Sequence, residues 1–346
     1  MEDGRRPMRL AGLVALALAT VALPAVAQEH RVFVSNEYGA DVTVIDPEAG
    51  PNGSADGAVA VSGRPGDVRP RGMAVSPDGR TVYVAVSDFL PRVERPEDAI
   101  VAIDVATGEV VREYRAGGNP ERVAISPDGR QIWAALEATA QAVGLDAETG
   151  EELGRFPTGV ESEGVDVSPD GRFVYVTGET SHTVTVIDAE ALRVVTHILV
   201  GNRPRDVVFS PDGTRAYASA EIGGTISVID VGEHRVIETI SLGLDSRPVE
   251  VDLSPDGALL YVAGGGTSAV YVIDTASGEV AHVIRERMGR RPWGVAVSPD
   301  GRHVYTANGL SDSVSVIDTE CMCVTGQIEA GRGAHSVEVG RVDDPS

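Results

Sequence analysis

The chain has 346 residues, with 52 acidic against 29 basic side chains and a formal net charge of −23 at pH 7. It contains no lysine, so every basic side chain is an arginine. Such an acidic surface repels phosphate groups, which argues against nucleic acid and anionic membrane faces as partners. The length suits one large domain, and no linker or low-complexity stretch divides it.

Residues 1–27 have the features of a cleaved export signal. Three arginines within the first nine residues precede an apolar run at 10–23, and Ala25-Val26-Ala27 offers a cleavage site before Gln28. The run is too short to make a good membrane span, and Met8 is an alternative start to Met1. We therefore expect a single mature domain, residues 28–346, in the periplasm or otherwise outside the cytoplasm and without a membrane span.

From Arg31 onward one unit repeats, represented by residues 201–240. Four strand-length apolar runs make up this unit: Asp206–Ser210, Ala216–Ala220, Thr225–Asp230 and Val236–Ile240. The first two runs are joined by Ser-Pro-Asp-Gly, in which Pro presets φ, Asp bonds its own backbone and Gly takes a positive φ. The same SPDG turn begins at Ser76, Ser126, Ser168, Ser210, Ser254 and Ser298. Each unit is therefore predicted to be a four-stranded antiparallel meander.

A spacing of 42–44 residues between most of the turns is typical of a β-propeller. The first unit begins with its second strand, Arg31–Ser35, followed by Val42–Asp46 and a fourth strand near Val59–Ser62. Its missing first strand is predicted near the other end of the chain, at Gly333–Val339. We therefore expect an all-β, seven-bladed propeller whose ring closes by pairing the C-terminal strand with the N-terminal strands. Closure protects the inner strand edges, and we expect a monomer.

Two units depart from the period. We interpret 47–57 and 63–72 as loops because they are rich in Gly and Pro. A further insertion, Asp88–Asp98, lies between strands two and three of its blade. It is either a lid or docking segment or a tolerated surface insertion.

One end of the ring carries the uniform SPDG turns, whereas the loops of the other end vary from blade to blade. We call the variable end of the central channel its mouth. We predict a mouth site for a small polar ligand or a cation, lined by Glu37, Arg71, Glu121, Glu137, Glu163, Glu179, Arg205, Glu221, Trp293 and His335. The alternative is that Arg71 pairs with Glu121, and Glu163 with Arg205, only to join neighbouring blades.

Motifs of established chemistry are absent from the sequence. It has no GxSxG, HExxH or phosphate-binding loop, and no CxxCH for covalent haem. Carboxylates such as Glu137 and Glu179 suit acid–base work or a divalent ion, but no nucleophile or metal-ligand spacing accompanies them. We therefore assign no catalytic residue and no metal, and favour a binding protein over an enzyme. For Cys321 and Cys323 three states stay open: a disulfide, free thiols, or a soft-metal site.

Two stretches, VYVTGETSHTVTVID (174–188) and VYTANGLSDSVSVID (304–318), resemble the YVTN family of β-propellers. Within that family, strings such as RPRGMAVSPDG, RPRDVVFSPDG and ASAEIGGTISVID are most similar to the propellers associated with pyrroloquinoline quinone (PQQ)-dependent alcohol catabolism. His335 stands where that family is expected to carry a bulky aromatic residue.

The resemblance implies an exported accessory protein that works beside quinoprotein dehydrogenases, c-type cytochromes or transporters. It implies an association with PQQ systems but leaves the cofactor itself undetermined. Two alternatives remain. One is a lactonase-like hydrolase or isomerase that uses the acidic part of the mouth. The other is a haem or cofactor carrier, similar to the d1-haem domain of nitrite reductase, which has eight blades.

Overall fold

The computed structural model describes residue 1 and residues 30–49, 53–61, 68–89, 95 and 98–341. Apart from Met1, the predicted export signal lies outside these residues. The described parts of the chain contain no helix that is long and apolar enough to cross a lipid bilayer.

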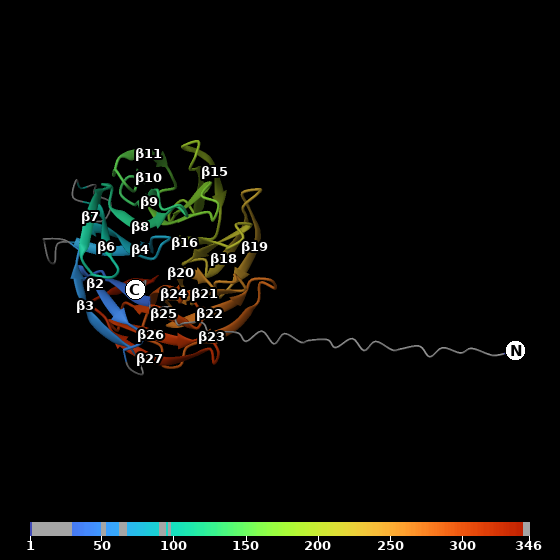
Figure 1. Cartoon of the computed structure of the whole chain (residues 1–346). Helices are drawn as coiled ribbons and strands as arrows, with labels where there is room; N and C mark the ends of the chain where they lie inside the picture. The colour runs from blue at the N-terminus through green and yellow to red at the C-terminus, as the bar shows by residue number, and fades with distance from the viewer. Residues whose placement is uncertain (2–29, 50–52, 62–67, 90–94, 96–97, 342–346) are drawn as a thin grey trace.

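The described residues form seven four-stranded antiparallel sheets, arranged as blades around a central channel (Figure 1). The strands of the first half are β1 His30–Asn36, β2 Asp41–Asp46, β3 Ser54–Ala60, β4 Val68–Val75, β5 Thr81–Asp88, β6 Ala99–Asp104, β7 Val110–Arg115, β8 Pro120–Ile125, β9 Gln131–Leu136, β10 Gln141–Asp146, β11 Glu152–Pro157, β12 Ser162–Val167, β13 Phe173–Gly178 and β14 Thr183–Asp188. Those of the second half are β15 Arg193–Leu199, β16 Pro204–Phe209, β17 Arg215–Ala220, β18 Thr225–Asp230, β19 Arg235–Ser241, β20 Pro248–Leu253, β21 Leu259–Gly264, β22 Ala269–Asp274, β23 Val280–Ile284, β24 Pro292–Val297, β25 His303–Asn308, β26 Ser313–Asp318, β27 Cys323–Glu329 and β28 Ala334–Arg341.

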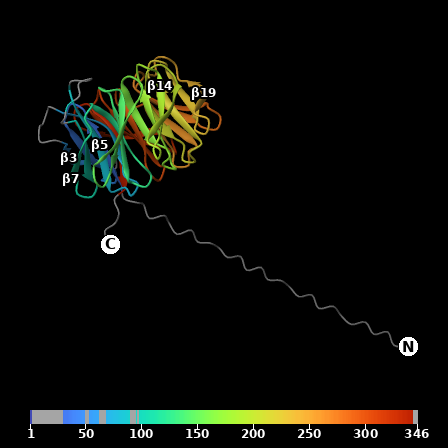
Figure 2. The ribbon, with the colours of Figure 1, turned by 90° about the horizontal axis from the view of Figure 1, so that it is seen from above.

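The ring closes through β28, as the sequence predicts. The sheet order is β28-β1-β2-β3, and the antiparallel register of β28 with β1 pairs Val339 with Val32 and Val337 with Val34. The first blade is thus built from both ends of the chain. Since His30 pairs with Arg341, both ends of the described chain lie at the SPDG end of the channel. Figure 2 shows the ring edge-on as a thick disc.

The core is divided among the spaces between neighbouring blades. One cluster, for example, joins Tyr83 and Ile100 of the β4–β7 blade to Val123 and Ile132 of the β8–β11 blade. Small and β-branched residues suit this arrangement because thin blades stack closely. The innermost strands, which line the channel, are β4, β8, β12, β16, β20, β24 and β28.

One innermost strand, β16, begins earlier than the apolar pattern predicts. β16 starts at Pro204 rather than Asp206, and its ladder with β17 shifts register between Pro204 and Val207. This β-bulge leaves Arg205 and Asp206 outside regular pairing, so both polar side chains can serve the channel. Six of the predicted mouth residues therefore belong to innermost strands, whereas Glu37, Glu137, Glu179 and Glu221 lie in the turns that follow second strands.

The loop predictions 47–57 and 63–72 are wrong at 54–57 and 68–72, where strands occur, and residues 50–52 and 63–67 lie outside the described part of the chain. The fourth strand of the first blade is Ser54–Ala60 rather than Val59–Ser62, and β4 already begins at Val68. Hydrogen bonding to β2 and to β5 holds these segments extended despite their weak strand propensity.

The Asp88–Asp98 insertion lies partly outside the described residues. At its start, the Phe89 ring stacks on Tyr38 at 6.2 Å between centroids. Arg95 Nε lies 2.8 Å from the Asp88 carboxylate. The described part of the insertion thus contacts the neighbouring blade through Tyr38.

The SPDG turn has the predicted chemistry. Ser210 Oγ donates a hydrogen bond to Asp212 at 2.6 Å and accepts one from the Arg215 backbone at 3.0 Å. Gly213 closes the turn with φ of 69°.

We expect Gly213→Val to lower the free energy of unfolding by about 1–3 kcal/mol, because a β-branched residue is strained at positive φ. Chemical denaturation measures this loss. Gly232→Val, at an exposed glycine of the same blade without positive φ, is the matched control and should stay within about 0.5 kcal/mol. Equal losses in the two variants would contradict the assigned role of Gly213.

Candidate functional site

Arg71 stands at the centre of one half of the mouth. Its guanidinium lies 2.8 Å from Glu37, 2.5 Å from Glu121 and 3.4 Å from Glu163. The side chain is only 10% exposed. Burial by itself would lower the pKa of Arg71, but the three carboxylates hold it above its ordinary value.

Arg205 plays the corresponding part in the other half. It pairs with Glu163 at 2.8 Å and with Glu179, and Glu221 lies 3.9 Å away. Its side chain is 6% exposed. Glu163 thus contacts both Arg71 and Arg205 and joins the two halves into one buried network.

Two further arginines complete the network, and neither is among the mouth residues predicted from the sequence. Arg69 lies 3.1 Å from Glu121, and Arg203 lies 3.0 Å from Glu179. Each stands two residues before a predicted mouth arginine, in the repeated string Arg-Pro-Arg. That repeat is the signal that would have identified them. We call these four arginines and Glu37, Glu121, Glu163, Glu179 and Glu221 the mouth network.

Aromatic rings occupy the rest of the mouth. Trp293 stacks on His335 with 5.4 Å between ring centroids. The guanidinium of Arg205 lies 5.3 Å from the Trp293 ring, and that of Arg291 lies 4.5 Å from it. Burial, together with Arg71 and Arg205, holds the pKa of His335 well below its ordinary value, so its ring is neutral.

The structure brings nine of the ten predicted mouth residues into contact with one another. Glu137 is half-buried, and its side chain makes no ion pair among the described residues. Both pairs foreseen by the purely structural alternative are present, Arg71 with Glu121 and Arg205 with Glu163. Whether the mouth also binds a ligand stays a prediction.

A second layer of charge lies below the mouth. Arg122 extends across the channel to Glu250 at 2.6 Å and to Asp206 at 3.3 Å, with Glu338 at 3.9 Å. These partners come from three other blades. A Cβ on Gly72 would lie 2.7 Å from the Arg122 side chain, so this glycine makes room for it. Between Arg122 and the mouth network remains a cavity of only about 20 Å³.

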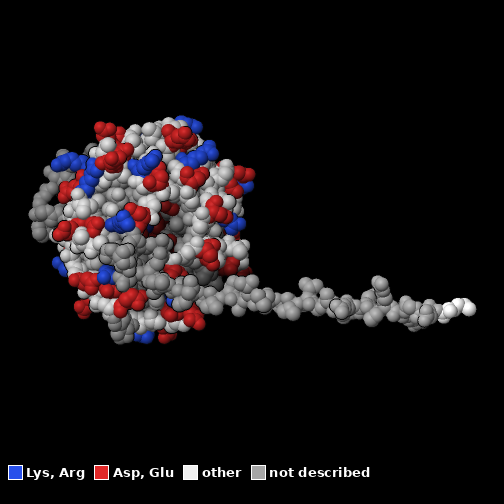
Figure 3. All heavy atoms as spheres, in the orientation of Figure 1, with Lys and Arg blue, Asp and Glu red and all other residues white. Residues whose placement is uncertain are grey.

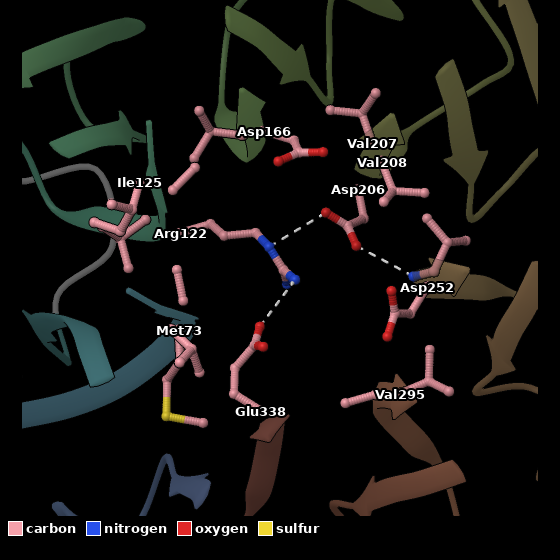
Figure 4. A pocket seen from close by; sticks show the side chains of 17 residues that line it. Met73, Arg122, Ile125, Asp166, Asp206, Val207, Val208, Asp252, Val295 and Glu338 are labelled. Carbon is pink, nitrogen blue, oxygen red and sulfur yellow. Dashed lines mark hydrogen bonds and ion pairs between the residues drawn. The ribbon is translucent and has the colours of Figure 1, made fainter. Parts of the chain in front are cut away.

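A larger cavity, of about 220 Å³, lies on the SPDG side of Arg122. We call it the Arg122 cavity (Figure 4). Asp166, Asp252 and Glu338 point into it from three different blades, between short apolar side chains such as Val208. Figure 3 views this end, where acidic residues are visible inside the central hollow. The repeat pattern did not single out these carboxylates, although an acidic residue inside an apolar innermost strand was the available signal.

The cavity carboxylates also join blades. Asp166 accepts a hydrogen bond from Phe209 N at 2.9 Å, and Asp252 accepts one from Val297 N at 2.7 Å. Burial nevertheless raises the pKa of Asp166 to about 7 and that of Asp252 to about 6. These groups therefore exchange protons near neutral pH. Among the described residues no group of three or more His, Cys, Asp or Glu side chains is arranged to hold a metal ion.

A pH dependence of stability follows from Asp166. Because its pKa is raised, the folded state binds this proton more tightly than the unfolded chain, so the stabilisation is present at low pH and is lost as the pH rises through about 7. Asp166 is partly exposed to the channel, and water screens the effect to about 1–2 kcal/mol. We expect Asp166→Asn to lose less stability than the unsubstituted protein as the pH rises from the acid side through about 7. Denaturation at several pH values measures this difference.

The control for this experiment is Glu151→Gln, on an exposed turn far from the channel. Its pH profile should match that of the unsubstituted protein. An Asp166→Asn profile parallel to both would show that Asp166 titrates normally.

Residues 190–338, which extend from just before β15 into β28, match the model of a family described as lactonase, 7-bladed beta-propeller. No curated protein sequence matches the chain.

Several solved structures share the fold. Hydrazine synthase of Kuenenia stuttgartiensis is 21% identical with a TM-score of 0.70, covering 79% of this chain and 95% of that chain. A candidate 6-phosphogluconolactonase from Bacteroides fragilis is 17% identical with a TM-score of 0.73, covering 92% and 100%. A protein of unknown function from Desulfotomaculum acetoxidans is 17% identical with a TM-score of 0.74, covering 90% and 99%. At these identities the likeness extends to the fold alone. Together with the seven observed sheets, the comparisons place this chain among the seven-bladed β-propeller proteins.

Proposed function

We propose that the protein is a ligand-binding propeller that takes a small polar ligand into the Arg122 cavity. The observation that carries this proposal is the cavity itself, which combines one cation with several carboxylates in about 220 Å³. The arginine can donate hydrogen bonds to hydroxyl and carbonyl oxygens of a ligand, and the carboxylates can accept hydrogen bonds from its hydroxyl groups. The matching ligand class is therefore small polyols, sugar acids and lactones.

The biological setting we propose is an exported accessory role in PQQ-dependent alcohol oxidation. Its support is the YVTN-like repeat and the Arg-Pro-Arg strings, together with the signal-like residues 1–27. A periplasmic dehydrogenase, a cytochrome c or a transporter component is the partner class. Recovery of the protein from the periplasm with Gln28 as its first residue would support export, whereas an intact N-terminus in the cytoplasm would contradict it.

Thermal-shift measurements with small alcohols, polyols, sugar lactones, PQQ, haem and divalent ions test the binding proposal. A ligand at 100 times its dissociation constant adds about 2.7 kcal/mol of stability. We expect a polyol or lactone to stabilise the protein. Glu338→Gln should raise the dissociation constant of that ligand at least tenfold and so reduce the stabilisation at a given ligand concentration. Glu338 suits this test because its side chain is 24% exposed and only weakly paired, so the fold should survive the substitution.

The exposed Arg130 at the SPDG end provides the control, and Arg130→Ala should bind like the unsubstituted protein. A panel without any stabilising compound would contradict the proposal. Stabilisation that is unchanged in Glu338→Gln would place the ligand outside the Arg122 cavity.

Lactone hydrolysis is the second candidate, and two observations favour it. One is the family match over residues 190–338, and the other is the pKa of Asp166 near 7, which suits a general base. In this reaction Asp166 takes a proton from water, the hydroxide attacks the carbonyl carbon, and the ring C–O bond breaks. Arg122 stabilises the developing oxyanion, and the leaving oxygen takes its proton back from Asp166.

A pH-stat assay with sugar lactones separates the two candidates. Turnover that falls roughly 10²–10⁴-fold in Asp166→Asn would support hydrolysis. Binding without turnover would leave the protein as a binding propeller.

A further inference from the structure

Cys321 and Cys323 are the chain's two cysteines, and they form a disulfide across a single intervening residue. The pair lies in the turn between β26 and β27, and Cys323 is the first residue of β27. Both cysteines are exposed to solvent. The turn lies at the SPDG end and is separate from the mouth network.

This turn does not require a cross-link. In the blade of β4–β7, Asp104 accepts a hydrogen bond from Thr107 N at 2.8 Å and another from the Thr107 hydroxyl at 2.9 Å. Thr107 occupies the position of Cys321. Asp318 accepts the equivalent bond from Cys321 N at 3.0 Å. The aspartate-capped turn also recurs, without cysteines, at Asp146, Asp188, Asp230 and Asp274.

The bond also contributes little as a constraint on the unfolded chain. The stabilisation that a disulfide supplies grows with the length of the loop it closes, and here that loop contains a single intervening residue. An exposed disulfide of small structural value belongs to the class that is labile or catalytic rather than structural.

We propose that Cys321–Cys323 is a redox-active disulfide that oxidises a dithiol on a partner protein. A partner thiolate attacks one sulfur, which forms a mixed disulfide and releases the other cysteine as a thiolate. The second partner thiol then attacks the mixed disulfide and releases the remaining cysteine. The partner leaves with a disulfide, while Cys321 and Cys323 hold the two electrons and two protons.

The surroundings of the pair indicate the charge of that partner. Asp318 and the exposed Glu320 flank it, on a chain whose net charge is −23. A dithiol within a basic surface would be attracted, whereas one within an acidic surface would be repelled.

Dithiothreitol serves as the model dithiol in the test, with the folded full-length protein. We expect one equivalent of dithiothreitol to be oxidised per chain, and the reduction rate to change less than about twofold when denaturant is added. Maleimide labelling followed by mass measurement counts the thiols. Cys321→Ser/Cys323→Ser should oxidise none and should melt like the unsubstituted protein.

Two results would overturn the proposal. One is a disulfide that is reduced only after the protein unfolds. The other is a large loss of melting temperature in the double-serine variant, which would make the bond structural. If both results are absent, the oxidation rates of two dithiol peptides of equal length, one basic and one acidic, are compared next. We expect the basic peptide to be oxidised at least tenfold faster at low salt.

Discussion

Deletion of residues 334–346 is expected to destabilise the protein far more than a single substitution does. The deletion removes β28, which pairs along its length with β1 and buries Ala334 and Val337 between blades. It exposes the edge of β1 and opens the ring between β24 and β4. We expect a loss well above the roughly 1–3 kcal/mol of a point substitution, with aggregation through the exposed edge.

Thermal melting and size-exclusion chromatography measure both effects. The matched control removes only residues 342–346 and leaves β28 complete, so it should melt like the full chain. If the longer deletion melted at the same temperature as the full chain, ring closure through β28 would contribute nothing to stability.

Arg205→Ala is expected to lower the free energy of unfolding by about 3–5 kcal/mol. The side chain of Arg205 is only 6% exposed, so water screens its ion pairs far less than those of a surface arginine. Removing the guanidinium leaves the buried carboxylates of Glu163 and Glu179 without this partner. Chemical denaturation at pH 7 measures the loss.

Two further variants serve as comparisons for Arg205→Ala. Arg130→Ala, at an exposed arginine of the SPDG end, should stay within about 0.5 kcal/mol. Arg203→Ala should cost no more than about 1 kcal/mol, because its side chain is 41% exposed. A loss of under 1 kcal/mol in Arg205→Ala would mean that water screens the mouth network.

Arg203→Ala also tests ligand binding at the mouth without unfolding the protein. If the mouth binds a ligand, this variant should weaken ligand-induced stabilisation while Glu338→Gln leaves it unchanged. The reverse pattern would place the ligand in the Arg122 cavity.

Turn chemistry made the blades predictable from the sequence. Each SPDG turn is built from contacts within six residues, as in the bonds from Ser210 to Asp212 and from Arg215 to Ser210. The predicted closure by the C-terminal strand was confirmed because the repeat left one innermost strand unaccounted for at the N-terminus. The loop predictions failed in segments such as Ser54–Ala60, where pairing with a neighbouring strand overrides a weak local strand preference.

The sequence by itself determined the seven blades, the closure and most of the residues that surround the mouth, because these follow from a period and from local turn geometry. Only the tertiary structure decided which charges meet and how deeply they are buried. Arg122 pairs with Glu250, 128 residues away along the chain. The Arg122 cavity likewise exists only because the ring brings Asp166, Asp252 and Glu338 from separate blades to one axis. Such contacts depend on where side chains of distant strands point across the channel, and a repeat period carries no information about that.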